Sequence, residues 1–121
     1  MYGVPPDLPV NVFVGQEFNQ ICLGRFQIQF HASGTGSIFV EGRWKLFDDK
    51  GVVIDEEQDH AKREAFRLHQ IIDVPILRAS INPPQSFSLL FENGWCLMIF
   101  DDMPHYESFS IDIDGQPSLF I

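Results

Sequence analysis

Apolar and polar residues alternate in short runs over most of this chain, and each run ends near a glycine or a proline. In the run 26–31, phenylalanine and isoleucine hold the even positions, whereas Gln27, Gln29 and His31 hold the odd ones. A period of two is typical of a β-strand with one buried and one solvent-facing side. The same pattern predicts further strands at 10–14, 21–23, 37–47 (interrupted near Gly42), 77–81, 87–91, 95–99 and 109–113.

Turn residues predict two antiparallel hairpins. The glycine-rich segment 33–37 joins the strands at 26–31 and 37–47. Asn93-Gly94, the strongest short hairpin signal in the chain, joins 87–91 to 95–99. The order strand, break, strand, turn, strand therefore occurs twice, which is consistent with a duplicated strand-hairpin unit.

One segment has helical periodicity instead. Its apolar residues Ala61, Ala65, Leu68 and Ile72 recur at helical spacing, and Asp55 is placed to cap the start of a helix at 56–72. Packed on one face of a curved antiparallel sheet of about six to eight strands, this helix predicts an α+β fold.

Length and composition set the domain organisation. With 121 residues, of which 45% are hydrophobic and twelve are phenylalanine, the chain fits a single folded domain at 1–121. Three prolines, at positions 5, 6 and 9, predict that residues 1–9 form an extended, proline-rich N-terminal arm. No signal-peptide pattern or membrane-length apolar stretch is found, so a cytoplasmic protein is expected.

The two cysteines, Cys22 and Cys96, lie in apolar runs. Reduced, buried thiols are expected for both, and burial would raise their pKa and reduce their reactivity. The sequence leaves open whether the two residues lie close together.

Charge is unevenly distributed along the chain. The formal net charge is −9, and no lysine or arginine follows Arg78. A surface of one negative sign repels nucleic acid and anionic lipid and favours a basic protein or a cation. Five late acids are therefore predicted to bind a basic protein partner: Asp101, Asp102, Glu107, Asp112 and Asp114.

Four residues near the start of this acidic segment are candidate metal ligands: Asp101, Asp102, His105 and Glu107. Carboxylate and imidazole groups are suitable ligands. Their spacing matches no calcium loop and no zinc motif, so the simpler interpretation is a solvated turn, and no metal or other cofactor is predicted. Neither a G-x-S-x-G nucleophile motif nor a phosphate loop is present, and no catalytic residue is predicted.

Strand alternation also predicts contacts. Four apolar residues are expected to be buried on one sheet face: Trp95, Leu97, Phe109 and Ile111. If the alternation continues backwards, Glu107 shares this side and needs a basic partner, because an unpaired buried carboxylate is costly. The expected partner is Arg78, Arg43 or Lys45.

The segment 91–102 contains the element F-x-N-G-W-x-L followed by two acids, and residues 106–108 read Tyr-Glu-Ser. In this pattern the chain resembles a family of small bacterial single-domain proteins of unknown function. Further segments similar to the family pattern occur at 14–15, 28–30 and 38–42, so the resemblance spans most of residues 13–113. It implies a compact α+β domain and no established activity, cofactor or catalytic residue.

These observations predict a non-enzymatic binding module. Its concrete form is an immunity-like protein that masks the cationic surface of a toxin. Small acidic proteins of this size resemble toxin-immunity proteins in general character. Two alternatives stay open: a small-molecule or metal-dependent enzyme that uses the loop 101–107, and a self-associating structural domain, such as a homodimer paired through exposed strand edges.

Overall fold

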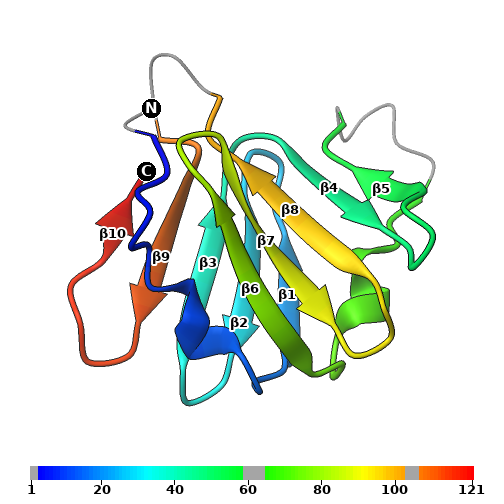
Figure 1. The fold of residues 1–121 in the computed structure, drawn as a ribbon, viewed down its shortest axis with the longest axis horizontal. Coiled ribbons are helices and arrows are strands. Elements are labelled where there is room, and N and C mark those ends of the chain that lie inside the picture. The colour runs from blue at the N-terminus through cyan, green and yellow to red at the C-terminus, as the bar shows by residue number, and fades with distance from the viewer. Residues whose placement is uncertain (1–2, 59–64, 103–106) are drawn as a thin grey trace.

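Two antiparallel sheets of five strands each make up the described part of the chain (Figure 1). The computed structural model describes residues 3–58, 65–102 and 107–121. Sheet A contains, in spatial order, β1 (Gln20–Leu23), β2 (Ile28–Ala32), β3 (Gly36–Val40), β9 (Phe109–Ile113) and β10 (Leu119–Phe120). Sheet B contains β5 (Val53–Glu56), β4 (Trp44–Phe47), β8 (Cys96–Phe100), β7 (Ser86–Phe91) and β6 (Ile76–Asn82). Two 3₁₀ turns complete the described elements, η1 (Val10–Phe13) and η2 (Leu68–Ile71).

The fold is all-β, so the predicted α+β class is wrong. Within the predicted helix at 56–72, Glu56 ends β5 and residues 68–71 form one 3₁₀ turn, while residues 59–64 lie outside the described part of the chain. In the described residues there is no helix long and apolar enough to span a membrane.

The expected helix cap, Asp55, explains this error. Its buried carboxylate accepts hydrogen bonds from the backbone N–H groups of Arg67 (2.7 Å) and Leu68 (3.1 Å), twelve and thirteen residues further on. Asp55 lies in β5 and accepts the free N–H groups at the start of η2. It does not cap a helix that begins at the next residue. The neighbouring Glu56 lies opposite Lys45 in the register of β5 with β4.

The strand predicted at 10–14 is also wrong, because residues 10–13 form η1. In this turn Val10 and Phe13 are buried, whereas Val12 is exposed. The buried pair is three residues apart, which matches one 3₁₀ turn and not a strand.

The hydrophobic core lies between the two sheets. Phe87 of β7 and Phe109 of β9 meet across it at 5.0 Å between ring centroids, and Phe18 packs against Phe30 at 5.4 Å. The predicted single buried face is corrected accordingly. Leu97 enters the core from sheet B, Phe109 and Ile111 enter it from sheet A, and Trp95 is only half-buried at its edge.

The two sheets have the same strand order with the halves of the chain exchanged. Sheet A reads β1-β2-β3-β9-β10, and sheet B, read from its β6 edge, is β6-β7-β8-β4-β5. Each half thus contributes a three-stranded meander to one sheet and two strands to the other. The interruption predicted near Gly42 is the first crossing between the sheets, and the segment between Phe100 and Phe109 is the second.

The proline-rich N-terminal arm packs on the body of the domain. Val4 and Leu8 are buried in the core, and the Val4 N–H donates to the Pro84 carbonyl at 2.9 Å. The arm therefore covers the β6–β7 connection.

Candidate functional site

Asp101, the first candidate acid, is used inside the fold. Its carboxylate accepts hydrogen bonds from Ser108 Oγ (2.7 Å) and from the Gly3 N–H. Burial opposes its ionisation, but the hydrogen bonds that it accepts, these two among them, outweigh burial and hold the pKa of Asp101 below its usual value. The carboxylate is therefore a structural acceptor that fixes the chain between the two sheets.

Asp102 has a basic neighbour from the first half of the chain. Arg43 Nε lies 2.7 Å from Asp102 Oδ2, and the guanidinium also lies 3.9 Å from the centroid of the Phe100 ring. Both charged side chains are exposed, at 45% and 41%. The negative run is thus interrupted by a cation, although the second half of the sequence contains none after Arg78.

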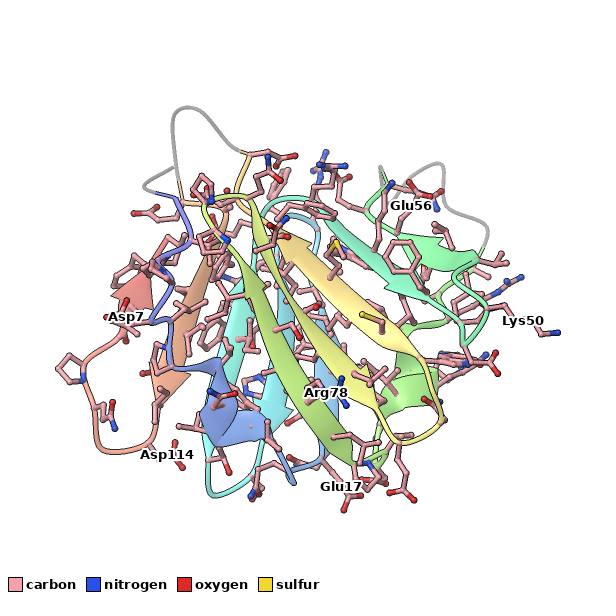
Figure 2. The ribbon with its side chains drawn as sticks, in the orientation of Figure 1. Asp7, Glu17, Lys50, Glu56, Arg78 and Asp114 are labelled. Carbon is pink, nitrogen blue, oxygen red and sulfur yellow. The ribbon has the colours of Figure 1, made fainter. Side chains whose placement is uncertain are left out.

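Glu107 does not follow the expected alternation. It is half-buried, whereas Ser108 and Phe109 after it are both buried, so the period of two breaks where β9 begins. Among the described residues Glu107 forms no ion pair, and the expected pairing with Arg78, Arg43 or Lys45 is not found there. Figure 2 shows Arg78 on the outer side of sheet B.

Asp112 and Asp114 lie at the other end of β9. Asp112 is exposed and accepts a hydrogen bond from Ser118 Oγ at 3.0 Å, and the Asp114 N–H donates to the Thr35 carbonyl at 2.9 Å. Figure 2 shows Asp114 beyond the C-terminal end of the strand. Since five strand residues span about 13 Å, the candidate acids form two groups and not one patch.

Metal ligands are not assembled in the described residues. Across 3–58, 65–102 and 107–121, no group of three or more histidine, cysteine, aspartate or glutamate side chains could hold a metal ion. Of the four candidate ligands, His105 lies outside the described residues. Asp101 and Asp102 have the structural partners given above.

The two cysteines lie on opposite outer sides of the domain. Cys22 pairs with Gln29 in sheet A, and Cys96 pairs with Phe47 and Leu90 in sheet B. Both are free and half-buried, which corrects the expectation of full burial. Burial raises the pKa of the Cys96 thiol, against the opposing effect of a hydrogen bond with Ser88, so this thiol is a poor nucleophile at neutral pH.

A row of hydrogen-bonded side chains runs along the outer face of sheet A. Ser37 Oγ lies 2.7 Å from His31 Nδ1, and His31 Nε2 lies 3.0 Å from Gln29 Oε1. Gln29 Nε2 donates to Gln27 Oε1 at 2.8 Å, and Gln27 Nε2 donates to Glu41 Oε1 at 3.2 Å. We call these five side chains the polar row.

The direction of every bond in the polar row is fixed by the carboxylate at its end. Glu41 only accepts, so both glutamine amides point their NH₂ groups toward it, and Gln29 Oε1 must accept from His31 Nε2–H. Neutral His31 is therefore the Nε2–H tautomer, and its Nδ1 accepts from the Ser37 hydroxyl. The row is ordered before any ligand arrives.

Acidic residues lie at both ends of the polar row. Glu41 forms one end, and Asp112 is the cross-strand neighbour of Ser37 at the other. The five strands of sheet A contain no lysine or arginine, whereas those of sheet B contain Lys45 and Arg78. The outer face of sheet A is thus the face of this domain best suited to a cationic ligand.

The alternation at 27–31 placed three members of the polar row on one side of a strand. Their link to Ser37 and Glu41 depends on the pairing of β2 with β3, which single residues do not show. No family model, curated protein or solved structure matches this chain. The family resemblance, which spans most of residues 13–113, stays a prediction.

Proposed function

We propose that this chain is a non-enzymatic binding module that recognises a basic protein through the outer face of sheet A. The observation that carries the proposal is the polar row with Glu41 at one end and Asp112 beside the other. Its concrete form is an immunity-like role in the cytoplasm, in which this face covers the cationic surface of a toxin.

The polar row supports binding because its side chains are already held in place. Ordering flexible side chains opposes association by about 0.5–1.5 kcal/mol for each one immobilised, and hydrogen bonds within the row reduce that cost. The strands of sheet A contain no lysine or arginine that would repel a basic partner during approach, and Arg25 lies outside them, in the turn between β1 and β2.

The spacing of the two carboxylates defines the partner further. Ser37, the neighbour of Asp112, and Glu41 are four residues apart on and just beyond β3, which corresponds to about 13 Å. A partner surface that presents two lysine or arginine side chains at this separation would meet both acids together.

Charge reversal tests this face against the rest of the acidic surface. The test protein carries Glu41→Lys and Asp112→Lys, and the matched control carries Asp7→Lys and Glu92→Lys, all four wild-type side chains being exposed. Both variants change the net charge by the same amount. Proteins that the wild type captures from the native lysate are identified. The dissociation constant of each captured protein is then measured with the wild type, the sheet A variant and the control variant.

We expect the sheet A variant to lose at least tenfold in affinity and the control to lose little. Association of the wild type should slow steeply once ionic strength passes about 0.1 M, where the Debye length is about 10 Å. Equal losses in both variants would mean that only net charge matters, and unchanged binding in both would remove the proposal.

A further inference from the structure

Only Phe26 and Phe120 are exposed among the twelve phenylalanines of the chain, and Phe26 is 78% exposed. No other large hydrophobic residue of the described segments is as exposed. Phe26 lies in the turn between β1 and β2, and Leu23 at the end of β1 is 48% exposed. An exposed ring of this kind is available to a partner, and aromatic side chains are enriched at protein interfaces.

The turn itself does not require an aromatic residue at position 26. The Gly24 N–H donates to the Gln27 carbonyl at 2.8 Å, and a Cβ at Gly24 would lie only 2.8 Å from the same oxygen. The close approach at Gly24 and the pairing of Leu23 with Ile28 therefore hold the turn.

The surroundings of Phe26 match the centre of a protein interface. The Arg25 guanidinium lies 5.1 Å from the ring centroid, and the adjacent Gln27 donates its amide to Glu41. Aromatic and arginine side chains carry most of the binding energy in protein interfaces, and polar groups surround them. Phe26 therefore directly precedes Gln27, the residue that links the turn between β1 and β2 to Glu41.

We infer that Phe26 is the anchor of the binding module, inserting its ring into an apolar pocket of the basic partner while Glu41 meets a lysine or arginine at the rim of that pocket. This inference rests on the proposed function and adds the kind of partner surface required. The partner must present a cavity of the size of a phenyl ring with a cation beside it.

Site-specific photo-crosslinking tests the contact even before the partner has been identified. The photo-reactive residue p-benzoylphenylalanine replaces Phe26 in one protein and Phe120, which is 59% exposed on the edge strand β10, in a control. Each protein is irradiated in native lysate, and the crosslinked peptides are sequenced by mass spectrometry. We expect position 26 to crosslink to the protein that the wild type captures, at an apolar segment close to a lysine or arginine.

Affinity measurements with the captured protein complete the test. Phe26→Ala should raise the dissociation constant about 30-fold or more, chiefly through faster dissociation, whereas Phe120→Ala should change it less than threefold. Both variants should melt within about 2 °C of the wild type, because neither ring is buried. Crosslinks from position 26 to a second copy of this chain would overturn the inference.

The outcomes separate the two proposals. Loss of binding in Glu41→Lys/Asp112→Lys with unchanged binding in Phe26→Ala would overturn the anchor and keep the function proposed for sheet A. Unchanged binding in both would overturn the anchor together with that function.

Discussion

Ser108 Oγ donates a 2.7 Å hydrogen bond to Asp101 Oδ1, and this bond closes the segment through which the chain passes from sheet B to sheet A. The carbonyl of Ser108 also accepts the N–H groups of Glu41 and Gly42, both at 2.9 Å, in the other crossing between the sheets. Ser108 is fully buried. Both crossings therefore meet at Ser108, and the Asp101 carboxylate accepts a hydrogen bond from the hydroxyl group of this residue.

The first prediction follows from the lowered pKa of Asp101. A carboxyl whose pKa is lower in the folded state stabilises the fold above its unfolded pKa, about 3.9, and loses this contribution as pH falls through the folded value. Asp101→Asn should therefore lower the melting temperature at pH 7 and lose this disadvantage near pH 2. The exposed Asp102→Asn is the control, and a difference for Asp101→Asn that stays constant between pH 2 and pH 7 would contradict the linkage.

The second prediction concerns the buried carboxylate of Asp55. Asp55→Ala leaves the backbone N–H groups of Arg67 and Leu68 without this acceptor, and each unsatisfied buried donor costs about 1–3 kcal/mol. We expect urea unfolding to show a loss of about 2–4 kcal/mol. Glu57→Ala, at an exposed position close by, should change stability by less than about 0.5 kcal/mol. Equal effects would show that the hydrogen bonds to η2 contribute nothing.

The third prediction concerns the glycine at the start of β3. A Cβ at Gly36 would overlap the Asp112 carbonyl oxygen and lie 3.0 Å from Ile113 Cα, both in the backbone of β9. Gly36→Ala should therefore separate β3 from β9 and destabilise the domain strongly. Gly34→Ala, in the same turn but with open space around it, should cost only about 1–2 kcal/mol for its positive φ. Thermal melts of the two variants compare these costs, and equal melting temperatures would refute the close approach.

The fourth prediction separates the two tryptophans. Trp44 is fully buried between the sheets, and Trp44→Ala should cost about 3–5 kcal/mol because it leaves a large cavity. Trp95 is half-buried at the edge of the core, so Trp95→Ala should cost clearly less. Chemical denaturation of both variants checks the order, and a larger loss for Trp95 would mean that the β7–β8 turn packs more deeply.

The fifth prediction concerns the polar row. Nitrogen-15 NMR of neutral His31 should show the proton on Nε2, because Gln29 Oε1 only accepts. Gln29→Leu removes that acceptor and should allow the Nδ1–H tautomer to appear. In Ser110→Ala, on the same sheet face but outside the row, the tautomer should stay unchanged. A wild-type protein with the proton on Nδ1 would reverse the bond directions along the row.

Local signals in the sequence predicted both hairpins and most of the strands, although not β5 or β10, because the causes of a hairpin are local. Asn93-Gly94 turns the chain within four residues, and Gly94 has the positive φ of 88° that such a turn needs. The pairing of β7 with β8 follows directly from it. The alternation in 26–31 likewise placed His31 on the solvent-facing side of β2.

The predicted helix failed because its signals also fit a different structure. An aspartate followed by acids and alanine resembles a capped helix, yet Asp55 accepts N–H groups from residues twelve and thirteen positions away. The contacts of the late acids were also not predicted from the sequence. Arg43 reaches Asp102 across 59 residues, and Gly3 reaches Asp101 across 98. The spacing of residues along the chain does not show contacts between residues so far apart in the sequence.

The exchange of strands between the two halves of the chain has a consequence during protein synthesis. β4 pairs with β8, so roughly 50 residues must be added after Phe47 before its second neighbour exists. At about 5–20 residues per second the ribosome needs about 2–10 s for this stretch. During that time β3 and β4 each present an unpaired edge. The nascent first half therefore exposes two strand edges over this interval, and the domain closes only after β9 has been synthesised.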